Sequence, residues 1–343
     1  MTPKKPLRRW LAWTVAGVLI ASALALLVVI SMHPSTVASA SLSVRQFTFR
    51  TNARRVLGPS NVEQLLISGL SSLQIQLNSA QVIRISGAPV QATSIDIQGE
   101  PSAFCSFYHV RSGGLEMSGP SIITLGSPRT RGRASFSLKV HGPLRANLTS
   151  QPNQSGLRPG FECKRVHVNG GSAGDVEASM SPQGGDSIFF STSSDARLDF
   201  DLTSQSEIGD TQIPILGEIR FSEIDPHTSE EKTVLLTPPS GYKNEVSFEK
   251  LDKRVTLDDA DLLVVIPKSD FYLRRFIVKD GIQLSLHGVV HDVRKGAGSS
   301  GLETRMPSAF DHLDNMKRIF GVIPALVALI LGILERMGLL SEK

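Results

Sequence analysis

SFSLKV at residues 135–140 and RLDFDL at residues 197–202 alternate apolar and polar side chains without interruption. Because successive side chains of a strand point to opposite faces, this period of two is typical of half-buried antiparallel strands. Turns rich in Gly and Pro separate such segments. We therefore predict a mainly β fold, an antiparallel sandwich or jelly-roll-like structure with one or two lobes. Four more segments carry the same pattern: LQIQL (73–77), SIDIQ (94–98), GEIRF (217–221) and IQLSL (282–286).

One segment has the pattern of a helix instead. Ser60-Asn61-Val62-Glu63 fits the S-x-x-E box of a helix N-terminus, in which the serine and glutamate side chains satisfy backbone N–H groups of the first turn. Leu65, Leu66 and Leu70 come after it. The sequence therefore predicts one short helix from Ser60 inside the β-rich region.

Charge divides the central part of the chain. Residues 41–170 contain 14 Lys and Arg against 5 Asp and Glu, whereas residues 171–305 contain 14 against 23. We expect a basic β-rich lobe over residues 41–170 and an acidic β-rich lobe over residues 171–305, which can simply neutralise each other. The alternative is that the basic lobe presents a patch to an anionic surface such as lipid headgroups. That patch would consist of Arg111, Arg129, Arg131, Arg133, Lys139 and Arg145.

The amino-terminal region has the pattern of a membrane anchor. Residues 1–9 form a basic segment, and its four cationic side chains equal the formal net charge of +4 for the whole chain. Residues 10–31 are apolar and long enough to cross a bilayer core of about 30 Å. The positive-inside rule keeps residues 1–9 in the cytoplasm and exports the chain beyond residue 31. A cleaved signal peptide ending at Ala38-Ser39-Ala40 is the alternative, but the apolar run is longer than signal peptides usually have.

A second apolar segment lies near residue 343. Residues 307–318 predict a short amphipathic helix, and residues 319–340 predict a second transmembrane or membrane-associated helix. A helix packed on another protein or in the core is the alternative, and Lys317 and Arg318 on the exported side run against the charge rule. Small residues at spacing four allow helices to approach closely and pair. They are Gly17, Ala21 and Ala25 in the first segment, and Gly321, Ala325, Ala328 and Gly332 in the second.

Cys105 and Cys163 are the two cysteines of the chain. In an exported domain cysteines can oxidise, and an even number within one lobe predicts a disulfide. Two buried free thiols are the alternative. Two cysteines this far apart do not form a metal site.

The sequence predicts no catalytic residue, no cofactor and no metal site. Residues 170–174 match G-x-S-x-G, but a nucleophile elbow needs a helix directly after the serine within an α/β fold. His287 and His291 are four apart in a predicted strand, where such positions lie roughly 13 Å from each other. They are therefore expected to be two separate strand histidines.

These patterns favour a membrane protein, most simply of the bacterial inner membrane, with residues 41–305 on the periplasmic or extracellular side. The leading hypothesis is a structural, interaction or sensory subunit of a membrane complex, with membrane lipids and a protein partner or second copy contacting the apolar helices. The alternative is a β domain that binds or carries lipid or glycan, and the third hypothesis is an enzyme. Nucleic acid is not an expected partner, because aromatic residues interleaved with basic ones are absent.

Overall fold

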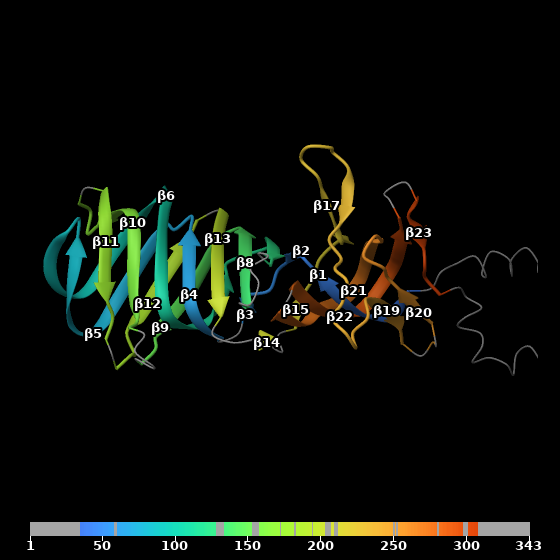
Figure 1. Ribbon diagram of the computed structural model, residues 1–343, viewed down its shortest axis with the longest axis horizontal. Coiled ribbons are helices and arrows are strands. Elements are labelled where there is room, and N and C mark those ends of the chain that lie inside the picture. Colours follow the sequence, from blue (N-terminus) through green and yellow to red (C-terminus); the bar gives the residue numbers. More distant parts are fainter. Residues whose placement is uncertain are drawn as a thin grey trace, which may run out of the picture. The chain divides into compact units, whose positions relative to one another are not determined.

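The computed structural model describes residues 35–307, except 58–59, 128–133, 153–157, 172, 182, 194, 203–206, 209–211, 250, 252, 280 and 298–300. Within this part every regular element is a strand (Figure 1), so the predicted mainly β fold is confirmed. None of its segments forms an apolar helix with the length to cross a bilayer. The two predicted membrane segments, 10–31 and 319–340, and the small residues on them lie outside the described residues, as does nearly all of 307–318.

Twelve strands form the larger sheet, and almost all of its members pair antiparallel with neighbours far away in sequence. Along the sheet the order is β10-β11-β5-β12-β9-β6-β4-β13-β8-β7-β2, with β3 beside β6. The strands are β2 (Gln46–Thr51), β3 (Arg55–Leu57), β4 (Ser60–Ser68), β5 (Ser72–Ile85), β6 (Ala88–Met117), β7 (Ser121–Gly126), β8 (Ala134–His141), β9 (Leu144–Ser150), β10 (Gly160–Val168), β11 (Ala173–Ser179), β12 (Ser187–Thr192) and β13 (Asp195–Leu202).

The second sheet has nine strands, ordered β14-β21-β22-β1-β19-β20, with β15 and β16 beside β21 and β23 beside β22. A separate two-stranded sheet pairs β17 with β18. Their bounds are β1 (Thr36–Val44), β14 (Glu207–Ile208), β15 (Ile213–Pro214), β16 (Ile219–Arg220), β17 (Ser222–Ile224), β18 (Glu231–Thr233), β19 (Glu245–Phe248), β20 (Arg254–Thr256), β21 (Leu262–Lys279), β22 (Gly281–Gly296) and β23 (Glu303–Thr304).

The long strand β6 organises the larger sheet. Its first part pairs with β5 and its last part pairs with β9, while β12 joins β5 to β9. These four strands therefore form a closed cycle of hydrogen-bonded neighbours. Gly99 lies where β6 passes close to the turn at Leu70, and a Cβ at this position would collide with the carbonyl oxygen of Leu70. The close approach of β6 to Leu70 thus requires a residue without a side chain at position 99.

Alternation of side chains supplies the core, as the sequence patterns predict. All six quoted segments contribute to strands, and their apolar members Leu73, Ile97, Leu138, Leu198 and Leu284 are buried. Aromatic packing adds to this core, because the rings of Phe136 and Phe200 stack with centroids 4.6 Å apart. The charge boundary near residue 170 falls inside the larger sheet, between the paired strands β10 and β11.

The helix expected from Ser60 is wrong, because residues 60–68 form β4 between β6 and β13. On the β6 side, Val62 and Gln64 pair with residues that are also two positions apart. On the β13 side, their partners Leu202 and Asp201 are adjacent in sequence. Glu63 is therefore an extra residue relative to β13, which is a β-bulge. The bulge puts Val62 and Leu65, three apart, on the same buried face. The S-x-x-E box of residues 60–63 thus lies in a strand that contains a bulge, not at a helix N-terminus.

Candidate functional site

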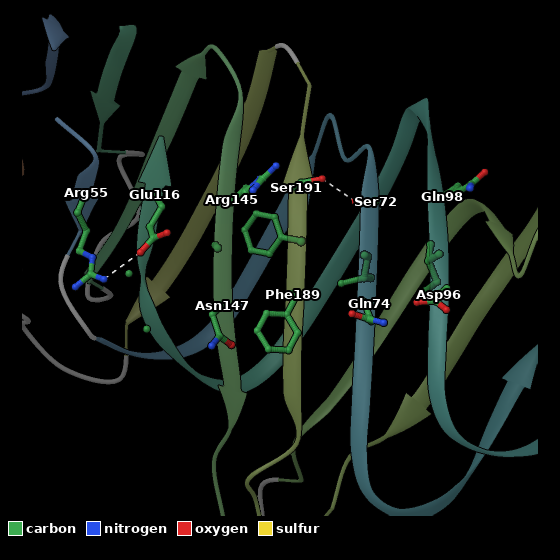
Figure 2. A pocket seen from close by; sticks show the side chains of 16 residues that line it. Arg55, Ser72, Gln74, Asp96, Gln98, Glu116, Arg145, Asn147, Phe189 and Ser191 are labelled. Carbon is green, nitrogen blue, oxygen red and sulfur yellow. Dashed lines mark hydrogen bonds and ion pairs between the residues drawn. The ribbon is translucent and has the colours of Figure 1, made fainter. Parts of the chain in front are cut away.

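A groove with a volume of about 780 Å³ lies on the exposed face of β5, β6, β9 and β12. The opposite face of these strands is buried core, including Leu73, Ile97 and Phe190. We call the exposed face the polar groove (Figure 2). Its volume lies within the range of about 300–1,000 Å³ that is usual for small-ligand sites.

Strand register arranges the groove side chains in two adjacent rows that run across the strands. The first row has Glu116, Arg145, Ser191, Ser72 and Gln98 as directly opposed neighbours. The second row has Asn147, Phe189, Gln74 and Asp96. Since each of these positions alternates with a buried residue, all nine side chains share one face. Residues from four strands, separated by up to 119 positions, thus meet on one surface.

Phe189 is the one exposed large apolar side chain among the described residues that line the groove. It is 41% exposed, whereas Phe190, the next residue on β12, is 3% exposed. In the register, Asn147 of β9 and Gln74 of β5 oppose Phe189 on its two sides. Figure 2 shows the ring beside the Asn147 amide. This half-exposed ring therefore leaves apolar surface between two amides, where a ligand could cover it.

The charged groups of the groove differ in their partners. Glu116 accepts a hydrogen bond from Arg55 at 3.0 Å, and both side chains are exposed. Arg145 has no ion-pair or hydrogen-bond partner for its guanidinium among the residues that the structure describes. Ser72 and Ser191 hydroxyls are 2.6 Å apart. Of its described residues, the groove therefore offers Arg145 near Phe189 as a cation without a partner and, three strands away, the exposed carboxylate of Asp96.

The chemistry of these groups suits a ligand that is rich in hydroxyls. Asn and Gln amides donate through nitrogen and accept through oxygen, and a carboxylate accepts only. A sugar hydroxyl can both donate and accept, while the C–H groups of a sugar ring form an apolar face that can pack on an aromatic ring. The groove thus combines the two features that a carbohydrate needs.

His167 borders the groove, directly opposite Gln98. Its Nδ1 lies 2.9 Å from the carbonyl oxygen of Gly171, and its Nε2 lies 2.9 Å from Glu100 Oε1. Both partners accept hydrogen bonds, so they favour the doubly protonated ring. These contacts raise the pKa of His167 above its ordinary value of 6.5, and the Gly171 carbonyl has a larger effect than Glu100.

The predicted anionic patch is only partly described. Arg111 on β6 and Arg145 on β9 are exposed, and Arg145 lines the groove. Lys139 is on β8, opposite Arg197 of β13. Arg129, Arg131 and Arg133 lie outside the described residues.

The two cysteines are joined as the sequence predicts. Cys105 on β6 and Cys163 on β10 are directly opposed, and their sulfur atoms are 2.06 Å apart in a disulfide. Both residues are fully buried. The disulfide therefore links two strands of the larger sheet from inside its core.

The other motifs have structural positions. Ala173 and Gly174 belong to β11, which pairs antiparallel with β10, so a strand lies where a nucleophile elbow needs a helix. His287 and His291 both lie on β22, in agreement with the prediction of strand histidines. His287 Nδ1 is 2.9 Å from Ser39 Oγ. In the described part of the chain no three His, Cys, Asp or Glu side chains converge as metal ligands would.

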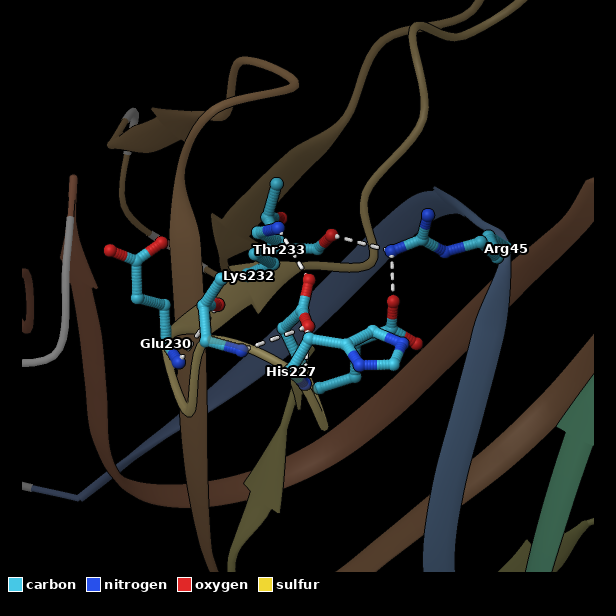
Figure 3. Close-up of polar contacts among 8 residues, drawn as sticks. Arg45, His227, Glu230, Lys232 and Thr233 are labelled. Atoms are coloured by element: carbon cyan, nitrogen blue, oxygen red, sulfur yellow. Dashed lines mark hydrogen bonds and ion pairs between the residues drawn. The ribbon is translucent and has the colours of Figure 1, made fainter.

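A short arm, residues 222–233, contains β17 and β18 and is held by polar contacts (Figure 3). Arg45 bonds to Glu223 at 2.5 Å and to the Thr233 carbonyl at 3.2 Å. Lys232 bonds to Asp225 at 2.6 Å. The hydrogen bond from Lys232 is the main reason that the pKa of Asp225 is lowered to about 2, and the backbone N–H groups of His227 and Thr228 contribute less. Ile224 on the same arm is 73% exposed.

Sequence patterns did not single out Phe189, Gln74 or Asp96, and they mark Asn147 only as the first residue of a possible glycosylation acceptor, Asn147-Leu148-Thr149. One signal for Phe189 was present in SIFFST, residues 187–192. In a strand two consecutive phenylalanines must point to opposite faces, so one of them leaves the core. The amides and the carboxylate carry no such local signal, because register alone brings them to Phe189.

Comparison with known proteins adds no further guide to this groove. No family model matches the chain, and no curated protein is detectably similar to it.

Proposed function

We propose that the protein is a membrane-anchored recognition domain outside the cytoplasm, and that its polar groove binds an extended glycan. The observation that carries this proposal is the exposed ring of Phe189 between the amides of Asn147 and Gln74. One sugar ring would stack on Phe189, while its hydroxyl groups exchange hydrogen bonds with the amides on both sides.

The spacing of the strands supports an extended ligand over a single sugar. Neighbouring strands lie about 4.8 Å apart, close to the length of one pyranose unit. The second row, from Asn147 to Asp96, spans four strands. A glycan chain lying across the strands would therefore place successive sugars over successive side chains of this row.

The same lining argues against a lipid in the groove. Burying an acyl chain favourably requires apolar surface, at about 25 cal/mol per Å². Of the large apolar side chains among the described groove-lining residues, Leu73, Ile97 and Phe190 are buried and Phe189 alone is exposed, surrounded by amides, hydroxyls and charges. A binding role also fits the chemistry better than catalysis, since the groove side chains resemble ligand contacts more than an acid–base pair.

The anchoring part of the proposal rests on sequence. Residues 10–31 would hold the β domain at the membrane, and residues 319–340 would tether its other end. A recognition domain fixed in this way faces glycans at the cell surface at high local concentration.

Binding of glycans to the full-length protein in lipid nanodiscs tests the proposal. We expect at least one polysaccharide from a mixed neutral and acidic panel to bind, and Phe189→Ala to weaken that binding by about tenfold or more. Ile122→Ala is the matched control, because Ile122 is an exposed apolar residue on β7, outside the groove. Equal affinities for both variants, or no binding by the wild type, would refute the proposal.

The arm favours a second candidate, contact with a partner protein in the membrane. Ile224 is the most exposed large apolar residue of the described chain, and the arm that presents it is fixed by Arg45. A photo-crosslinking residue at position 224 should yield one discrete adduct in membranes, whereas the same residue at Val82, which is 55% exposed, should not. Identical patterns at both positions would exclude this role.

A further inference from the structure

We infer that the glycan of the polar groove is acidic, and that Arg145 binds a carboxylate carried by one of its sugars. This inference rests on the proposed function and adds the chemical class of the ligand. It starts from the position of Arg145, one strand from Phe189 and two residues before Asn147 on β9. A sugar stacked on Phe189 or its neighbour toward β9 would lie within reach of this guanidinium.

Arg145 is available because its acidic neighbour is occupied. Glu116 opposes Arg145 across β6 and β9, yet it forms its ion pair with Arg55 on the other side, at 3.0 Å. Figure 2 shows the Glu116 carboxylate turned toward Arg55 and the Arg145 side chain turned toward Ser191. An arginine presents a planar fork of donors that matches a carboxylate with two parallel hydrogen bonds. The groove therefore presents, beside its aromatic platform, a cation that has no counter-ion among the described residues.

The opposite end of the groove limits where the ligand carries charge. Asp96 is three strands from Arg145, roughly 14 Å at about 4.8 Å per strand. A carboxylate on every sugar would place a like charge beside Asp96, which is unfavourable. The preferred ligand is thus a glycan in which acidic sugars alternate with neutral ones. Its carboxylate lies at Arg145, and hydroxyl groups of a neutral sugar donate to Asp96.

The experiment uses full-length protein in uncharged nanodiscs and octasaccharides in which a uronic acid alternates with a neutral sugar, in several linkages. Each octasaccharide is compared with its carboxyl-reduced form, which has the same ring and hydroxyl groups without the charge. We expect at least one acidic octasaccharide to bind about tenfold or more tightly than its reduced form, and more weakly as salt is raised. Arg145→Gln should remove this difference.

Arg111→Gln is the matched control, because Arg111 is exposed on β6, loses the same charge and does not line the groove. It should leave the preference for the acidic form intact. Equal binding of acidic and reduced forms, with loss of both in Phe189→Ala, would overturn the inference and leave the proposed function standing. Binding of neither form would overturn both. A third outcome is that the protein binds no glycan but attaches to phosphatidylglycerol vesicles, and that Arg145→Gln and Arg111→Gln weaken this attachment equally. That result would assign these arginines to the membrane surface instead.

Discussion

Phe189 and Phe190 are consecutive on β12 but point to opposite faces of the sheet, the first 41% exposed in the polar groove and the second 3% exposed in the core. Identical side chains thus serve two different purposes. Phe190 contributes to stability, and Phe189 leaves apolar surface in contact with water. This separation allows stability and binding to be tested by one pair of substitutions.

Phe190→Ala should lower the free energy of unfolding by about 3–5 kcal/mol, since it leaves a cavity in the core. Phe189→Ala should change that free energy by less than about 0.5 kcal/mol, the usual range for surface positions. Urea unfolding followed by far-ultraviolet circular dichroism measures both values. A large destabilisation by Phe189→Ala would mean that its ring is a structural element and would weaken the case for recognition.

Asp186 is a buried carboxylate that ties three chain segments together. Its Oδ1 accepts the Asn78 N–H at 2.8 Å, and its Oδ2 accepts the Ser181 N–H at 2.6 Å and the Ser150 hydroxyl at 3.1 Å. Asp186→Asn puts an NH₂ group against one of these donors and should destabilise the domain by about 1–3 kcal/mol. Asp195→Asn is the control, since the Asp195 side chain is 75% exposed, and should cost less than about 1 kcal/mol. If both substitutions lowered the free energy of unfolding equally, the buried hydrogen bonds of Asp186 would contribute no extra stability.

The disulfide between Cys105 and Cys163 closes a loop with a sequence separation of 58. On the chain-entropy model, closing such a loop stabilises the folded state by about 4 kcal/mol. The Cys105→Ala, Cys163→Ala double variant should therefore unfold at a lower urea concentration than the oxidised wild type. Reduced wild-type protein should resemble the double variant. Unchanged unfolding midpoints would mean that the native sheet alone holds β6 against β10.

Periodicity predicted the strands well, because burial of one face depends on the local alternation of side chains. It did not predict their order, since pairs such as Ser72 with Ser191 depend on register between distant strands. The helix expected from Ser60 was wrong because the S-x-x-E box is matched by residue type alone, whereas residues 60–68 pair as a strand with β6 and β13. Cys105 and Cys163 were predictable because their chemistry allows one pairing. The groove was not, because Asn147, Gln74 and Asp96 are ordinary exposed strand residues until β9, β12, β5 and β6 are placed side by side.

The contacts of His167 predict a pH dependence at the edge of the groove. Both ring nitrogens face acceptors, the Gly171 carbonyl and Glu100, and together these raise the pKa of His167 above 6.5 in the folded chain. Because the folded-state pKa exceeds the unfolded one, these contacts stabilise fully below about pH 6.5, and their contribution is lost as pH rises through the folded-state pKa. An NMR titration of the imidazole should give a pKa above that of free histidine, and Glu100→Gln should lower it.

The same variant supplies the stability test. Glu100→Gln removes the negative charge beside the ring but keeps an oxygen acceptor, so its effect depends on protonation of His167. The difference in unfolding free energy between wild type and Glu100→Gln should be largest near about pH 5.5 and should vanish near about pH 9, where the ring is neutral. A difference that stays constant across this range would mean that Glu100 acts on the domain through something other than the imidazolium. In that case the raised pKa of His167 would have to come from the Gly171 carbonyl, which the substitution leaves in place.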